Sequence, residues 1–140
     1  MKLMAILLLA AFSTLAIAAE KDTREPLEAL HGDTMGELML CQISFKMATL
    51  NATAEGADYH TCINAAQPKT KPALKRALAA QAKKPTAVKA IKIYYAAWLA
   101  SVRGITPGID EVRLTYGARQ TQNEQRLNEL WAAVEMESGL

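Results

Sequence analysis

The sequence lacks most of the features by which an enzyme is identified from its residues. It has only two cysteines and two histidines. The Cys-x-x-Cys spacing of redox enzymes, a Cys-His signature and a glycine motif around serine or threonine are all absent. Aromatic residues and runs of valine, isoleucine and threonine are few, which disfavours strands, whereas abundant alanine and leucine favour helices. We therefore expect an all-α protein that is not an enzyme.

A long apolar run occurs only at the start of the chain, in residues 1–19 (MKLMAILLLAAFSTLAIAA). Lys2 followed by apolar residues and a small-x-small site at Ala16 to Ala18 predicts a secretory signal peptide that is removed. An uncleaved anchor is the alternative, since a run of about 17 residues is near the lower limit for spanning a bilayer. We expect residues 20–140 to form one periplasmic or secreted domain without a transmembrane segment.

The two cysteines, Cys41 and Cys62, are expected to form a structural disulfide. Export would place them in an oxidising compartment. If a turn lies near residues 52–53, Cys41 precedes it by about as many residues as Cys62 follows it, so the two differ in height by only about 3 Å in an antiparallel hairpin. Closing this loop would contribute roughly 3 kcal/mol in the loop-entropy description.

Prolines, glycines and capping residues predict a single-domain bundle of about five helices. Thr34-x-x-Glu37 resembles a capping box, Pro68 and Pro85 are expected to stop helices, and Gly104 is expected to end another. The expected helices span residues 34–51, 54–67, 71–83, 86–103 and 109–137. Residues 20–33 are expected to form an irregular arm or one short helix.

The expected helix over residues 34–51 has two apolar stripes separated by polar residues. One stripe holds Met35, Met39, Leu40, Ile43, Met47 and Leu50, and the other holds Leu38, Cys41, Phe45 and Ala48. Because a surface helix needs only one stripe, we expect this helix to lie at the centre of the bundle. The methionines are interpreted as core filler rather than metal ligands, and a small apolar ligand beside them is an alternative.

Charge is unevenly distributed. Residues 59–109 hold nine basic and no acidic residues, whereas the flanking segments 20–58 and 110–140 are net acidic. Neutralisation within the bundle is one interpretation, and a positive face for an acidic protein or an anionic surface is the other. The candidate contact residues are Lys75, Arg76, Lys83, Lys84, Lys89 and Lys92. Nucleic acid is not expected as a partner, because no binding motif accompanies the charge.

Neither a metal nor another cofactor is expected. His60-x-Cys62 provides half of a metal site, but a disulfide would remove the thiolate ligand, and we interpret His60 as a surface residue. Glu124, near Arg119 and Arg126, and the neighbouring acids Asp110 and Glu111 are interpreted as solvated or ion-paired rather than catalytic.

Three features of the sequence resemble those of small exported α-helical proteins of Gram-negative bacteria, such as those of pseudomonads. They are the apolar segment over residues 1–19, the single cysteine pair, and helix-favouring stretches such as YYAAWLASVRG. The resemblance implies no functional residues. We therefore favour an exported, non-enzymatic protein that binds a macromolecular partner through residues 69–92. One alternative is an immunity or inhibitor protein against a secreted toxin or wall hydrolase. Another is a small periplasmic hydrolase or metal-dependent enzyme that uses His60.

Overall fold

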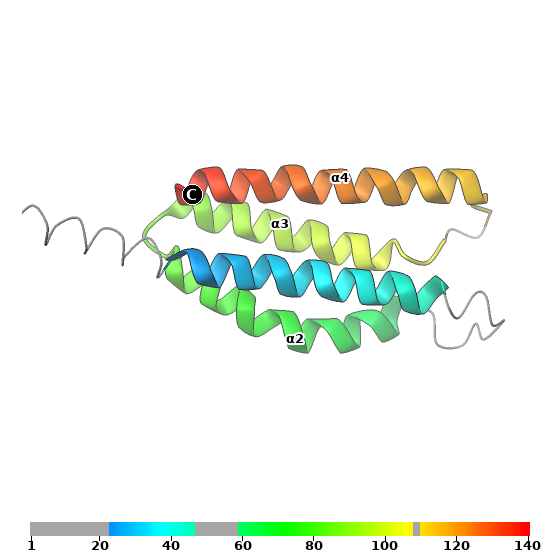
Figure 1. The fold of residues 1–140 in the computed structure, drawn as a ribbon, viewed down its shortest axis with the longest axis horizontal. Coiled ribbons are helices and arrows are strands. Elements are labelled where there is room, and N and C mark those ends of the chain that lie inside the picture. The colour runs from blue at the N-terminus through cyan, green and yellow to red at the C-terminus, as the bar shows by residue number, and fades with distance from the viewer. Residues whose placement is uncertain (1–22, 47–58, 108–109) are drawn as a thin grey trace, which may run out of the picture.

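The computed structural model describes residues 23–46, 59–107 and 110–140, and over these ranges the protein is a helical bundle without strands. A helix over residues 23–46, called the 23–46 helix below, is followed by α2 (Tyr59–Ala80), α3 (Pro85–Arg103) and α4 (Arg113–Ser138) (Figure 1). Residues 1–19, which are expected to be a signal peptide, lie outside the described residues. None of the described helices combines the length and apolar character needed to cross a bilayer.

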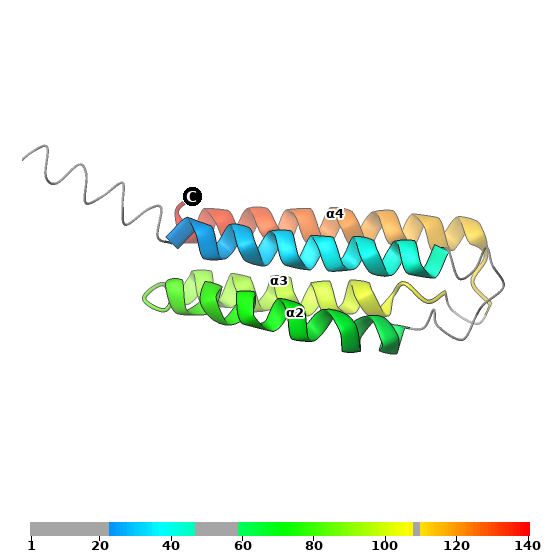
Figure 2. The same ribbon diagram turned by 60° about the horizontal axis from the view of Figure 1, so that its bottom comes forward.

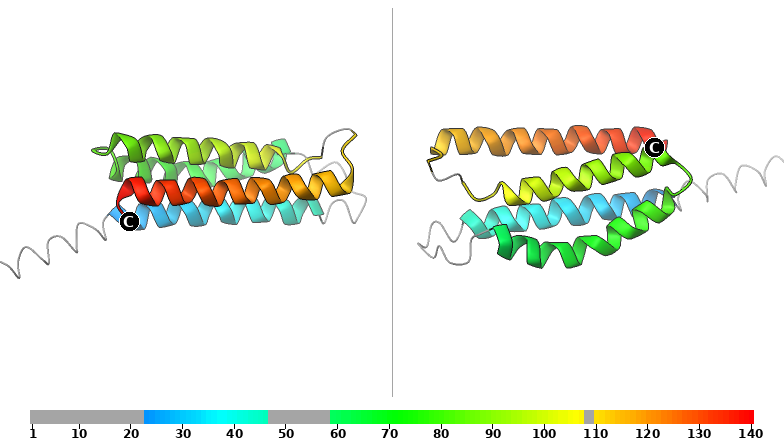
Figure 3. Two further views of the ribbon diagram at one scale, coloured as in Figure 1. Left: turned by 90° about the horizontal axis from the view of Figure 1, so that it is seen from above. Right: turned by 180° about the vertical axis from the view of Figure 1, so that it is seen from behind.

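Each helix runs antiparallel to the next one in the chain (Figures 1 and 2). The 23–46 helix contacts α2 through Cys41 and Cys62 and contacts α4 through Gln42 and Glu124, while it lies diagonally across from α3. The turn between α2 and α3 lies at the same end as the start of the 23–46 helix and the C-terminus, and we call this the turn end. The opposite end, where α3 connects to α4, is the loop end (Figure 3).

The described residues form four helices, not five, because α2 takes the place of the two helices expected over residues 54–67 and 71–83. Pro68 does not stop α2, which continues through Pro68 and Pro72 to Ala80. Both prolines are exposed, so the carbonyl groups that lose a backbone donor lie on the solvent side, and α2 curves along its length (Figure 3). A buried stripe spans both prolines and holds the helix in place: Ala66, Thr70, Ala73 and Ala77.

The first described helix begins at residue 23. The segment 20–33, expected to be an irregular arm or one short helix, is therefore helical where it is described, as the first part of a longer helix. Leu27 and Leu30 are fully buried, and their burial explains why this acidic segment folds. Thr34 is not a helix cap. It lies inside the helix, where its Oγ1 donates to the backbone carbonyl of Leu30 at 2.7 Å.

Two consecutive tyrosines of α3 connect it to two different helices. The Tyr94 hydroxyl lies 2.7 Å from Thr34 Oγ1 on the 23–46 helix, and the Tyr95 hydroxyl lies 2.9 Å from Thr70 Oγ1 on α2. Each threonine hydroxyl already donates its single hydrogen to the carbonyl four residues earlier, so the tyrosines are the donors. Successive residues of a helix point about 100° apart, which lets the adjacent pair reach both neighbours.

Trp98 completes this buried polar network. Its side chain is fully buried, and its Nε1 donates to the backbone carbonyl of Thr34 at 2.7 Å. His31 stacks on Trp131 of α4 with ring centroids 4.4 Å apart, and the edge of Tyr94 meets Trp131 at 5.0 Å. Aromatic contacts therefore join the 23–46 helix, α3 and α4 around Thr34.

The 23–46 helix does not lie at the centre of the bundle, so the expectation from its two stripes is wrong. The stripe with Leu38 and Cys41 faces the core. Of the other stripe, Met35 is partly buried against the core, whereas Met39, Leu40 and Ile43 are more than half exposed. Met47, Ala48 and Leu50 lie outside the described residues. An up-and-down bundle gives each helix a single inward face, and this helix is no exception.

Candidate functional site

The six candidate basic residues lie near the turn end and all are exposed. Lys83 and Lys84 are in the turn between α2 and α3, Lys89 and Lys92 follow in the first half of α3, and Lys75 and Arg76 precede the turn in α2. At about 1.5 Å per residue, these side chains start within roughly 15 Å of the turn along the helix axes.

Two of the six basic residues have structural partners. Arg76 lies 4.0 Å from Glu25 of the 23–46 helix, and both side chains are mostly exposed, so this ion pair contributes little. Lys84 donates through Nζ to the backbone carbonyl of Ser138 in the last turn of α4. A cation at this position satisfies a terminal carbonyl and opposes the negative end of the helix dipole.

The other four, Lys75, Lys83, Lys89 and Lys92, have no ion pair with any residue in the described part of the chain. The start of α3 adds to this positive region, since its first turn contains no acidic residue and its N-cap residue is Lys84, which makes no side-chain capping bond. The positive end of the α3 dipole therefore lies beside the unpaired lysines.

Apolar surface accompanies two of these lysines. Ile93 is 44 % exposed on α3, and a shallow hollow lies on each side of it. The hollow of about 440 Å³ is lined by Pro85, Val88, Lys89, Lys92, Ile93 and Ala96. The hollow of about 290 Å³ lies between α3 and α4 and is lined by Thr86, Lys89, Ala90, Ile93, Leu130, Ala133 and Glu137. The outer face of α3 thus combines cationic and apolar groups, a combination the sequence patterns did not predict.

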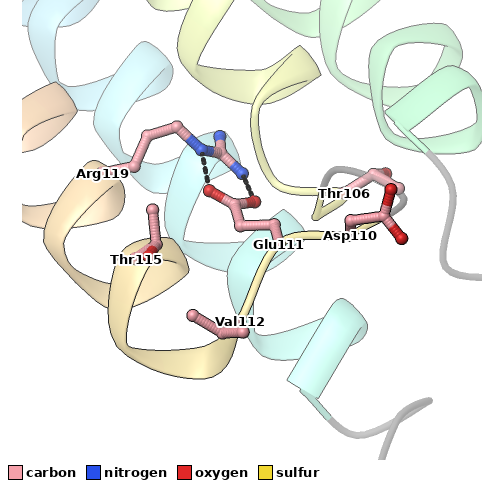
Figure 4. A pocket seen from close by; sticks show the side chains of 6 residues that line it. All are labelled: Thr106, Asp110, Glu111, Val112, Thr115 and Arg119. Carbon is pink, nitrogen blue, oxygen red and sulfur yellow. Dashed lines mark hydrogen bonds and ion pairs between the residues drawn. The ribbon is translucent and has the colours of Figure 1, made fainter.

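Arg119 organises the loop end (Figure 4). Its guanidinium forms a two-pronged ion pair with Glu111, with distances of 2.8 and 2.6 Å, and also donates to the backbone carbonyl of Gly104. Gln120 donates to the same carbonyl at 2.7 Å. These bonds attach the start of α4 to the end of α3, and Glu111 raises the pKa of Arg119 through hydrogen bonding.

Glycine at position 104 is favoured by the limited space beside it rather than by its backbone conformation. Its φ of −73° is accessible to any residue, but a Cβ there would lie 2.8 Å from Nη1 of Arg119. The sequence predicted a helix end at this glycine, which the structure confirms, but gave no sign of the approach by Arg119.

Two hollows lie at the loop end. The larger, of about 790 Å³, is lined by Gln42, Phe45, Lys46, Pro107, Glu111, Arg113, Tyr116, Gln120 and Glu124. A second, of about 670 Å³, is the one drawn in Figure 4, and Glu111 and Arg119 line it. Glu111 and Arg119 are paired with each other. Burial raises the pKa of Tyr116, so its hydroxyl is not poised as a base near neutral pH.

Cys41 and Cys62 face each other between the 23–46 helix and α2, 2.6 Å apart, but both are free thiols in this structure, so the expected disulfide is not present. The antiparallel pairing that brings them together is the one expected from their spacing. Burial raises the pKa of Cys41 to about 12, and contact with Cys62 adds to the effect. A thiol that is protonated at neutral pH is a poor nucleophile.

The histidines do not form a metal site within the described residues, where no group of three potential ligands is found. The side chain of His60 lies outside them. His31 instead packs on Trp131, and its pKa is lowered by burial, against the opposing charge of Glu135.

Comparisons with known proteins give no match. A scan against protein-family models, a search of curated proteins and a search of solved structures each find nothing similar to this chain. The functional interpretation therefore depends on the residues and their geometry.

Proposed function

We propose that the protein is an exported, non-enzymatic helical protein that binds an acidic, partly apolar protein surface through the outer face of α3. The observation that carries the proposal is the exposed Ile93, with a hollow on each side, next to Lys89 and Lys92, which form no ion pair with another described residue. An acidic partner would be attracted by the lysines, and an apolar side chain of that partner would fill a hollow.

The roles of five of the six basic residues separate under this proposal. Lys83, Lys89 and Lys92 are assigned to binding. Lys84 is assigned to capping α4, and Arg76 to its weak ion pair with Glu25. Reversing the charge of Lys84 would place an acid at the C-terminal end of α4 and destabilise the bundle, so it is unsuitable as a test of binding.

The test uses a triple variant, Lys83→Glu, Lys89→Glu and Lys92→Glu. Its matched control is Lys71→Glu, Arg113→Glu and Arg126→Glu, which changes net charge equally at exposed positions without ion pairs to other described residues. The probes are a synthetic glutamate-leucine peptide, the same peptide with serine in place of leucine, and phosphatidylglycerol vesicles. Fluorescence polarisation measures peptide binding, and flotation measures vesicle binding.

We expect the glutamate-leucine peptide to bind the unchanged protein and the control equally, and the triple variant at least about tenfold more weakly. The serine peptide and Ile93→Ser should each weaken binding, because both remove the apolar contact. Equal binding by the triple variant would refute the assignment. Tighter binding to the vesicles than to the peptide would indicate an anionic lipid surface instead of a protein.

We further propose that residues 1–19 are removed on export and that Cys41 and Cys62 then form a disulfide. Two electrons and two protons would pass to a disulfide-bonded oxidant by thiol exchange. Mass spectrometry of protein from the exported fraction should show a chain starting near residue 20 and two hydrogens lighter than its reduced form. Two alkylatable thiols would contradict the bond.

A further inference from the structure

The outward face of the 23–46 helix carries apolar side chains with no partner among the described residues. Met39 is 59 % exposed, Leu40 53 % and Ile43 51 %. Gly32 and Gly36 precede them, and a Cβ added at either glycine would meet no atom within 4 Å. The face is therefore apolar in its second half and nearly bare in its first half.

Seven residues form a line along this face, separated alternately by four and three positions. They are Glu25, Ala29, Gly32, Gly36, Met39, Ile43 and Lys46. This is the spacing of the contact positions between two helices that pack side by side at a shallow angle. The line is thus suited to contact one further helix along its whole length.

The line of residues is complementary to the same line on a second copy of the helix that runs in the opposite direction. In an antiparallel pair centred on Gly36, Glu25 meets Lys46, Ala29 meets Ile43, and Gly32 meets Met39. The two copies of Gly36 meet at the centre, where the absence of side chains lets the backbones approach closely. Large residues therefore lie opposite small ones, and opposite charges meet at both ends.

A parallel pair would not have this complementarity. It would place Glu25 against Glu25, Lys46 against Lys46, and Met39 against Met39, so like charges would repel at both ends. Glu25 is available for the antiparallel contact, because its ion pair with Arg76 is long and its side chain is 73 % exposed.

We propose that this face binds a second copy of the chain as an antiparallel, two-fold symmetric helix pair centred on Gly36. A two-fold interface requires a surface patch that is complementary to itself, which the line from Glu25 to Lys46 provides. One helix face buries less area than a standard interface, so the dimer should be weak and dissociate at micromolar concentrations. The 23–46 helix lies diagonally across from α3, which leaves the proposed partner surface on α3 free in the dimer.

Sedimentation equilibrium of the purified protein between about 1 and 500 μM tests this proposal. Gly36→Glu fills the centre of the pair with a charged side chain and should raise the dimer dissociation constant at least about tenfold. Gly117→Glu is the matched control, since Gly117 is also an open glycine within a helix. Both substitutions should preserve or raise the melting temperature, because glycine is unfavourable inside helices.

A charge exchange tests the antiparallel orientation. Lys46→Glu alone and Glu25→Lys alone should each raise the dissociation constant about threefold to tenfold, and the two together should restore it. In a parallel pair, either single change would exchange one like-charge repulsion for another and leave the constant unaltered. A monomer at every concentration, or a dimer insensitive to Gly36→Glu or to the single charge reversals, would overturn the proposal.

Discussion

The hydrogen bond between Tyr94 and Thr34 allows a quantitative test of the buried network. Both side chains have no exposed surface, and the hydroxyl oxygens lie 2.7 Å apart. Because Thr34 donates to the carbonyl of Leu30, Tyr94 is the donor in the pair. The two partners should therefore respond unequally to substitution.

Thr34→Val preserves the shape of the side chain but leaves the Tyr94 hydroxyl buried without an acceptor. The cost of an unsatisfied buried donor, added to the lost bond, predicts a loss of about 2–3 kcal/mol in the free energy of unfolding. Tyr94→Phe removes the donor itself, and Thr34 keeps its bond to Leu30, so the expected loss is only about 1 kcal/mol. The double variant leaves neither a buried donor nor its former acceptor and should also lose about 1 kcal/mol.

The double variant is therefore expected to be more stable than Thr34→Val alone. Urea unfolding followed by tryptophan fluorescence measures this, since Trp98 and Trp131 both lie in the core near the pair. Additive losses in the double variant, or a smaller loss for Thr34→Val than for Tyr94→Phe, would refute the donor assignment.

Two further predictions concern His31 and Gly104. Burial lowers the pKa of His31 below its usual 6.5, so the unfolded chain takes up a proton first, and the free energy of unfolding should decrease as the pH falls below about 6.5. His31→Phe keeps a ring against Trp131 and should reduce that slope in urea titrations at several pH values, whereas an unchanged slope would exclude His31 as its source. Gly104→Ala should displace Arg119 and lower the free energy of unfolding by about 1 kcal/mol, while Gly117→Ala, in open space, should raise it by about 0.5–1 kcal/mol. Equal effects of the two alanine substitutions in thermal unfolding would contradict the close approach at Gly104.

The sequence predicted the all-helical fold correctly. In α3, Ile91, Tyr95, Trp98 and Val102 recur three or four positions apart, and all four are buried. Periodicity locates such residues because one face of the helix is clearly more apolar than the others. Tyr94 lies on the same face, three positions after Ile91 and four before Trp98, and it is fully buried as well.

Local signals failed where tertiary contacts oppose them. Thr34 and Glu37 have the spacing of a capping box, yet burial of Leu27 and Leu30 extends the helix eleven residues further towards the N-terminus. Pro68 is unfavourable within a helix, but the buried stripe on both sides of it holds α2 continuous. Neither outcome can be read from a short sequence window, because the stabilising atoms belong to other segments.

Of the candidate site, the sequence predicted only the positive charge. Six basic residues could be named from the sequence, but the sequence did not show that Lys84 caps α4, that Arg76 pairs with Glu25, or that Ile93 lies exposed beside Lys89. These distinctions depend on which helices meet at the turn end.

The bond from Lys84 to the carbonyl of Ser138 has a practical consequence for handling the protein. Lys84 lies next to Lys83 in the turn between α2 and α3, and Ser138 is two residues before Leu140. The bond therefore holds the last residues of the sequence beside this turn. An affinity tag or surface coupling at the C-terminus would therefore crowd the face of α3 where a partner is proposed to bind. A coupling group introduced by substitution at an exposed loop-end position such as Leu114 would leave that face accessible.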